Sequence, residues 1–130
     1  MKPRFYTFSQ NNSGGSFTGP AAYVIVEALS PDDANNRAES AGLYFDGCDD
    51  GRDCSCCGDR WYRQFRADNG DDKPSIYGTP VDKADDLDRG LRPDKLPQAR
   101  VVFMNGKVKD YFPKRNQHDE SRPRKQKKPR

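Results

Sequence analysis

The sequence predicts an α+β protein, with a small antiparallel or mixed sheet, one main helix packed on it and a cysteine-rich loop. Three observations lead to this fold class. Residues Ala22–Ala28 are almost continuously apolar, as in a central strand. The segment that follows has the start and stop signals of a helix. Further along the chain, Asn105 and Gly106 separate two β-rich runs, a pattern typical of a hairpin.

Three segments are expected to form the sheet. Arg4–Phe8 is rich in aromatic and β-forming residues and predicts the first strand. Ala22–Ala28 provides the central strand, and Arg100–Phe112 provides a hairpin. The dipeptide Asn105-Gly106 favours a type I′ turn at the tip of this hairpin, in which both central residues take positive φ angles.

The main helix is predicted over Pro31–Ala41. Ser30 is its N-cap, Pro31 occupies its first position and Gly42 ends it. The stripe expected to face the sheet consists of small residues at helical spacing, namely Ala34, Ala38 and Ala41. A helix with such a stripe can lie close against a sheet.

The patterns elsewhere are weaker. Leu43–Phe45 and Ser75–Gly78 predict short strands, and Ala84–Arg89 predicts a short helix. The Gly-rich segment Asn11–Ser16 lacks the Lys-Ser/Thr ending of a P-loop, so we expect a flexible connection there.

The composition predicts one domain and a tail. Only 32% of the 130 residues are hydrophobic and 33% are charged, so the core must be small. We expect residues 1–113 to form a single α+β domain. Residues 114–130 contain no hydrophobic residue and are predicted to be disordered. This tail holds eight of the 23 Lys and Arg but two of the 20 Asp and Glu, so a slightly acidic domain precedes a basic tail.

The Cys/Asp-rich loop at about residues 46–60 lies within the stretch LYFDGCDDGRDCSCCGDRWY, which holds every cysteine of the chain. A run this polar cannot order itself by burying apolar surface. No apolar run approaches the roughly 20 residues of a membrane helix, and the first residues do not resemble a signal peptide. We therefore expect a cytoplasmic protein with no membrane partner, whose clustered cysteines bind a metal or stay reduced.

The loop is predicted to hold a structural Zn²⁺. The segment from Cys54 to Gly58 contains C-x-x-C-G, a spacing that directs two thiolates toward one metal. The glycine allows the backbone to turn beneath that metal. The predicted ligands are Cys48, Cys54, Cys56 and Cys57. Cys54 and Cys57 form the pair, with help from Cys48 or Cys56. The fourth position stays open, since the adjacent Cys56 and Cys57 are expected to point apart.

Other readings of the loop remain open. Asp46, Asp53, Asp59 or a second chain are alternative sources of the fourth ligand. Reduced cysteines packed beside Trp61 are the main alternative to zinc, and a redox pair is a third. A calcium loop is disfavoured, because cysteine replaces the third-position acid and the final glutamate of an EF-hand. The aspartates are instead expected to cap turns and to pair with Arg52 and Arg60.

No catalytic set emerges from the sequence. The sole histidine, His118, lies in the tail, so neither a Ser-His-Asp arrangement nor a Cys-His pair can be proposed within the domain. This pattern favours a binding protein over an enzyme.

Three motifs in order resemble a small protein family that is widespread in bacteriophage genomes and has no established function. They are FYTFSQNNSGGSF, then YVIVEA with the following DDANNRAE, then GLYFDGCDDGRDCSCCGDRWY, of which DCxCCGDRWY is the most characteristic. The resemblance covers about Phe5–Tyr62. It implies a phage origin and the cytoplasm of a host bacterial cell, and it supplies no activity.

Two functions follow as expectations. The first is a non-enzymatic interaction module that binds a host or phage macromolecule, expected to be a protein, and that is held partly by the cysteine-rich loop. The second is a nucleic-acid-binding protein that uses the basic tail, with exposed aromatic residues such as Tyr62 or Tyr77 stacking on bases. The tail residues expected to contact nucleic acid are Arg122, Arg124, Lys125, Lys127, Lys128 and Arg130.

Overall fold

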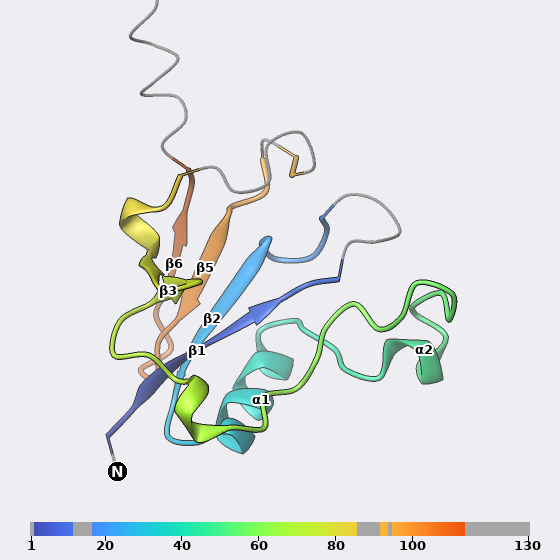
Figure 1. Cartoon of the computed structure of the whole chain (residues 1–130), viewed down its shortest axis with the longest axis horizontal. Helices are drawn as coiled ribbons and strands as arrows, with labels where there is room; N and C mark the ends of the chain where they lie inside the picture. Colours follow the sequence, from blue (N-terminus) through green and yellow to red (C-terminus); the bar gives the residue numbers. More distant parts are fainter. Residues whose placement is uncertain (1, 12–16, 86–91, 94, 114–130) are drawn as a thin grey trace, which may run out of the picture.

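A four-stranded mixed sheet forms the centre of the protein in the computed structural model, which describes residues 2–11, 17–85, 92–93 and 95–113. Its strands are β1 (Arg4–Ser9), β2 (Tyr23–Ala28), β5 (Ala99–Val102) and β6 (Val108–Tyr111). They lie in the order β1-β2-β5-β6, as Figure 1 shows. The strand β2 pairs antiparallel with β1 and parallel with β5, while β5 and β6 are antiparallel. The predicted mixed sheet with a central apolar strand is confirmed.

Smaller elements surround this sheet. They are the helices α1 (Pro31–Ser40) and α2 (Gly47–Asp50), the 3₁₀ turns η1 (Ala67–Asn69) and η2 (Val81–Lys83), and the strands β3 (Ser75–Ile76) and β4 (Thr79–Pro80). The strands β3 and β4 form a separate two-stranded antiparallel hairpin.

Helix α1 begins at Pro31, as the sequence predicts, and ends at Ser40, one residue before the predicted end, because Ala41 is its C-cap and is only partly buried. The Ser30 hydroxyl accepts a hydrogen bond from the backbone N–H of Asp33 at 3.1 Å, which caps the first turn. At the other end, Gly42 N donates to Glu39 O and Leu43 N donates to Ala38 O, at 3.1 and 3.0 Å. These two bonds form a Schellman motif, so the chain reverses at Gly42 and brings Leu43 back onto the core.

The core occupies both faces of the sheet, because successive side chains of β2 point to opposite sides. Val24 and Val26 are fully buried on one face, where Ala34 and Ala38 of α1 cover them. Tyr23 and Ile25 face the other side, where the smaller cluster includes the following buried residues: Phe17, Ile76, Val81, Ala99 and Val101. One helix and one short hairpin thus cover the two faces of the sheet.

Two local predictions were wrong. Leu43–Phe45 is not a strand, because Leu43 N bonds to the end of α1 and both Leu43 and Phe45 pack over a face of the sheet. The turn between β5 and β6 is not type I′, since Gly106 has a φ of +91° but Asn105 does not have a positive φ. Gly106 N instead donates to Phe103 O at 2.9 Å, and Phe103 N donates to Lys107 O at 2.8 Å. The loop is therefore longer than two residues.

Three further predictions fall largely outside the described residues. One is the flexible connection expected at Asn11–Ser16, of which only Asn11 is described. Most of the short helix expected at Ala84–Arg89 lies outside the described residues. Its first two residues, Ala84 and Asp85, are described and are not helical. The tail after Pro113 also lies outside the described residues, and with it His118 and the tail residues expected to contact nucleic acid.

Candidate functional site

Residues 43–66, called the arm below, leave the end of α1, form α2 and return to the first strand. Figure 1 shows α2 projecting well to one side of the sheet. The returning part of the arm continues the edge of the sheet, because Asn11 N donates to Arg60 O at 2.7 Å and Gln10 forms a β-bridge with Trp61. Trp61 is only 2% exposed and joins the core beneath α1. The arm is thus attached at its base by backbone pairing and one large buried ring.

The buried Gln10 side chain strengthens this attachment. Its Nε2 donates to Thr18 O and Ala21 O at 2.8 and 3.0 Å, and its Oε1 accepts from the Arg60 guanidinium at 2.8 Å. The amide therefore links the end of β1, the segment before β2 and the arm. A buried amide satisfied in this way stabilises the fold, whereas an unsatisfied one would destabilise it.

Two aspartates organise the interior of the arm. The Asp53 carboxylate accepts hydrogen bonds from the Tyr44 hydroxyl and from the backbone N–H of Arg60, both at 2.8 Å. The Asp59 carboxylate accepts from the backbone N–H of Cys48 at 2.9 Å. The acids do close turns as predicted.

The ion pairing of the arm differs from the prediction. Arg63 pairs with Asp46 at 2.7 Å, and Arg52 lies over the ring of Tyr44, 4.8 Å from its centroid. Within the described residues, no ion pair of Arg52 or Arg60 is found. The Arg60 guanidinium instead points inward toward β1 and donates a hydrogen bond to Gln10.

Three cysteines gather at the far part of the arm. The sulfur atoms of Cys54, Cys56 and Cys57 all lie within 4.8 Å of one another. The Cys54 and Cys56 sulfurs are 2.6 Å apart, and the Cys56 and Cys57 sulfurs are 3.8 Å apart. The expectation that Cys56 and Cys57 point apart was therefore wrong. The turn that brings the three thiols together is closed by Cys57 N and Gly58 N, which both donate to Cys54 O at 3.1 Å.

The fourth cysteine lies beside this cluster and outside it. The Cys48 thiol is 3.6 Å from the backbone oxygen of Cys54, so it reaches the same turn from the side of α2. Asp53 and Asp59 are already engaged with Arg60 and Cys48, as described above. The structure thus brings Cys54, Cys56 and Cys57 together and leaves Cys48 as the nearest remaining sulfur.

The thiols differ in acidity. The hydrogen bond from the Cys48 thiol to the Asp59 carboxylate, together with desolvation, raises the pKa of Cys48 to about 11. Hydrogen bonds to Cys54 and Cys57 raise the pKa of Cys56 to about 11. The same hydrogen bond from Cys56 lowers the pKa of Cys54 below its usual value. Cys54 therefore forms a thiolate before Cys48 and Cys56 as pH rises.

The three thiols fit a tetrahedral Zn²⁺ in chemistry and in part of their geometry. Soft sulfur donors suit zinc, and two thiolates on one ion lie about 3.8 Å apart when each Zn–S bond is about 2.3 Å. The separation of Cys56 and Cys57 matches this value, whereas Cys54 and Cys56 would have to move apart by about 1.2 Å. Within the described residues, these cysteines form the one cluster that could hold a metal ion.

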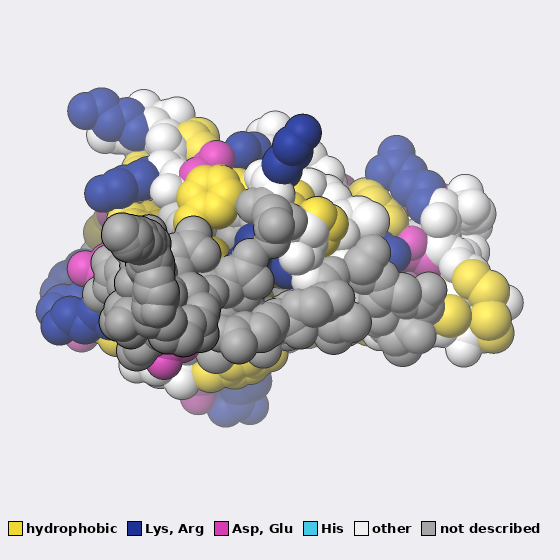
Figure 2. Space-filling view, turned by 90° about the horizontal axis from the view of Figure 1, so that it is seen from above, with side chains coloured by type: hydrophobic (Ala, Val, Ile, Leu, Met, Phe, Trp, Pro, Cys, Tyr) yellow, Lys and Arg dark blue, Asp and Glu magenta, His cyan; other side chains and the backbone are white. Residues whose placement is uncertain are grey.

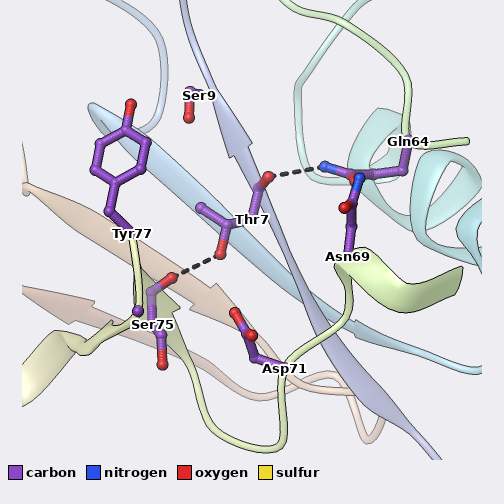
Figure 3. Close-up of a pocket in the computed structure, with 8 residues that line it drawn as sticks. Thr7, Ser9, Gln64, Asn69, Asp71, Ser75 and Tyr77 are labelled. Atoms are coloured by element: carbon purple, nitrogen blue, oxygen red, sulfur yellow. Dashed lines mark hydrogen bonds between the residues drawn. The ribbon is translucent and has the colours of Figure 1, made fainter. Parts of the chain in front are cut away.

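A polar cleft between β1 and β3 forms a second candidate site. It has a volume of about 390 Å³. The residues that line it are Thr7, Ser9, Gln64, Asn69, Asp71, Ser75, Tyr77 and Gly78. Figure 3 shows seven of these side chains arranged around one space, with Tyr77 and Ser9 at one end and Gln64 and Asn69 at the other. The lining comes from four separate segments with no shared motif, so sequence analysis did not find it. An exposed aromatic at Tyr77 was its only visible signal.

Large apolar side chains are also exposed at the base of the arm. Phe65 is 80% exposed and Tyr62 is 54% exposed. Figure 2 shows Lys and Arg side chains in several separate places on the face that it views. In the part of the chain that the structure describes, no helix is long and apolar enough to cross a membrane.

The family described as Domain of unknown function (DUF7296) matches residues 3–120. No curated protein and no solved structure matches the chain. The family match extends well past Tyr62, where the resemblance seen in the sequence ended. The strands β3 to β6 and both candidate sites therefore lie inside the same family domain.

Proposed function

We propose that this chain, which belongs to the DUF7296 family, is a non-enzymatic interaction module that binds a partner protein through the base of its arm. The resemblance of its motifs to a phage protein family supports placing it in the cytoplasm of a host bacterial cell, with a host or phage protein as its partner. The zinc-loaded cysteine cluster holds the outer part of the arm in one shape.

The exposure of Phe65 on an ordered backbone is the observation that carries this proposal. Phe65 is 80% exposed, yet the preceding residue, Gln64, is held by both ends of the Asn35 side chain. An exposed aromatic ring on a fixed backbone loses little entropy when it enters a pocket on a partner, which is typical of interface anchors. Tyr62 adds a second ring three positions earlier.

Zinc would be held by Cys54, Cys56 and Cys57, with Cys48 as the fourth ligand. A structural ion of this kind ties ligands together and supplies folding free energy, without taking part in a reaction. The Cys48 sulfur now lies 3.6 Å from the backbone oxygen of Cys54. To join the site, the Cys48 thiol would turn away from this oxygen toward the other three sulfurs. Binding would then fix α2 to the turn at Cys54–Gly58.

The test compares partner binding by matched aromatic variants. The wild-type chain, Phe65→Ser and Phe112→Ser are immobilised and exposed to lysate from a bacterial host, and retained proteins are identified by mass spectrometry. Phe112 is 55% exposed but lies outside the arm, so it controls for loss of any exposed ring. We expect a partner that wild type and Phe112→Ser retain and Phe65→Ser loses. Equal retention by all three, or no retained protein, would rule the proposal out.

A second candidate function rests on the basic tail, which holds eight Lys and Arg in 17 residues. Such a segment binds nucleic acid with an affinity that falls steeply with salt. Fluorescence anisotropy with a single-stranded oligonucleotide, for the full chain and for a chain ending at Pro113, tests it. Salt-dependent binding that requires the tail supports this function, and tail-independent or absent binding excludes it.

A further inference from the structure

We infer that the polar cleft between β1 and β3 binds an uncharged, hydroxyl-rich small molecule, namely a saccharide, with Tyr77 as the aromatic wall. This site is separate from the exposed rings of the arm. The inference therefore does not depend on the proposed function.

The outer edge of β1 provides the floor of the cleft. Phe5 exchanges backbone hydrogen bonds with Asp71 at 2.9 and 2.8 Å, and Asn11 N donates to Arg60 O at 2.7 Å. Because backbone groups of an antiparallel strand alternate in direction, Thr7 and Ser9 also present their N–H and C=O groups to this edge. The edge of β1 is already paired on both sides of these two residues, at Phe5 by Asp71 and at Asn11 by Arg60. The open stretch is too short for a peptide strand to pair with it and suits a small ligand.

Several polar groups around this floor have unused hydrogen-bonding capacity. Gln64 donates from Nε2 to Thr7 O at 2.7 Å, which fixes the amide and leaves its Oε1 as an acceptor (Figure 3). Within the described residues, no hydrogen bond is found for the Ser9 hydroxyl, the Asn69 side chain or the Asp71 carboxylate. Together they offer both donors and acceptors over a short distance, which is what the hydroxyl groups of a sugar require.

The charge of the cleft restricts its ligands. Asp71 is the only charged side chain among the described residues that line it. No Lys or Arg contributes to the lining, so a phosphate or carboxylate ligand would meet one negative charge and no positive one. A single carboxylate among neutral amides and hydroxyls is well suited to accept hydrogen bonds from sugar hydroxyls.

Tyr77 stands at the mouth of the cleft in a backbone conformation that few tyrosines adopt. Its φ is +50° and that of Gly78 is +85°, so the pair forms the two-residue turn between β3 and β4. Asn or Gly at the first position would fit such a turn better than a bulky residue. The ring is 78% exposed and packs edge-on against Tyr23 at 5.9 Å between centroids. Backbone strain that keeps an exposed ring beside a cleft is typical of ligand-contacting positions.

The volume agrees with this class of ligand. Small-molecule sites begin at about 300 Å³. At about 390 Å³ the cleft has room for a mono- or disaccharide.

The experiment titrates the ¹⁵N-labelled full chain with maltose, lactose, mannobiose and chitobiose, one at a time, and follows backbone amide shifts. The variants are Tyr77→Asn, which suits the turn and removes the ring, and Asp71→Ala. Phe112→Ala is the control, because it removes an exposed ring outside the cleft. Tm is measured for every variant, and we expect Tyr77→Asn to keep the wild-type Tm or exceed it.

The expected result is a saturable shift of the Ser9, Asn69 and Gly78 amides with at least one disaccharide. Tyr77→Asn and Asp71→Ala should each weaken this binding roughly tenfold, and Phe112→Ala should leave it unchanged. The inference is overturned if none of the four sugars shifts these amides, or if both cleft variants bind as well as wild type. A response to arginine methyl ester or glucose 6-phosphate in place of the sugars would also overturn it, in favour of a cation or anion site. Phe65→Ser should bind the sugar normally, so failure of the arm proposal is distinguishable from failure here.

Discussion

Asn35 of helix α1 holds the backbone of Gln64 with both ends of its side-chain amide. Its Nδ2 donates to Gln64 O at 3.0 Å, and its Oδ1 accepts from Gln64 N at 2.7 Å. Asn35 is 7% exposed and Gln64 is partly buried, so both bonds are partly shielded from water. Gln64 in turn bonds to Thr7 O, and it stands next to Phe65. One amide on the helix thus positions the return of the arm, one wall of the polar cleft and the exposed phenylalanine.

Replacing this amide is expected to destabilise the protein. Asn35→Ala removes two hydrogen bonds to partly buried backbone groups of Gln64, which should lower the free energy of unfolding by about 1–3 kcal/mol. Asn36→Ala is the matched control, since Asn36 lies next to it in the same helix and is exposed. Urea denaturation of both variants measures the difference. A loss of stability in Asn35→Ala no larger than in Asn36→Ala would show that the two hydrogen bonds from Asn35 to Gln64 contribute nothing to stability.

The cysteine cluster is expected to bind one zinc ion. Native mass spectrometry in neutral buffer should show the mass of one Zn²⁺, and Cys57→Ser should remove it, because three adjacent thiols supply most of a tetrahedral site. Ser55→Ala, in the same turn but without a thiol, should keep the metal. A zinc-free spectrum for the wild-type chain purified without chelators and then supplied with Zn²⁺ would contradict this prediction.

In metal-free protein, Trp61 should matter more for stability than any cysteine. Trp61 is 2% exposed, whereas Cys54 and Cys56 are exposed. Trp61→Ala should therefore cost about 3–5 kcal/mol, and Cys56→Ser should cost much less. Thermal unfolding in the presence of a chelator checks both. The prediction fails if the two variants lose the same stability without metal.

The thiols of the metal-free protein should react with iodoacetamide in a fixed order. Cys54, whose pKa is lowered, should be alkylated at neutral pH before Cys48 and Cys56, whose pKa values are about 11. Their rates should rise as pH increases toward 11, since only the thiolate reacts. Removing the nearby carboxylate in Asp59→Asn should speed alkylation of Cys48 and leave Cys54 unaffected. Peptide mapping after short exposures gives the order, and faster labelling of Cys48 than of Cys54 would contradict it.

Much of the sheet and helix was predictable because those segments have strong local signals. The apolar run of β2 and the Ser30–Gly42 caps depend on neighbours in sequence, and both predictions were confirmed. The parallel pairing of β2 with β5 has no such local signal, because it is set by tertiary packing. The Asn105-Gly106 turn was mispredicted because a glycine with a positive φ also suits a longer hairpin loop that ends in a left-handed residue.

The candidate sites were predictable to different degrees. The cysteine cluster followed from a short spacing, although the geometry placed Cys56 with Cys57 contrary to expectation. The polar cleft could not be predicted, since its lining residues are ordinary polar side chains gathered from distant segments. The two hydrogen bonds between the Asn35 side chain and the Gln64 backbone could not be predicted either, because an asparagine inside a helix usually faces solvent.

The parallel pairing of β2 with β5 has a consequence for how the chain folds as it is made. Tyr23 pairs with Ala99, so the two central strands are separated by more than 70 residues of sequence. Contacts between such distant residues form slowly, because a long loop must close first. At about 5–20 residues per second, synthesis delivers β5 several seconds after β2. During that interval the most apolar strand of the protein has one bare edge, and aggregation competes with completion of the sheet.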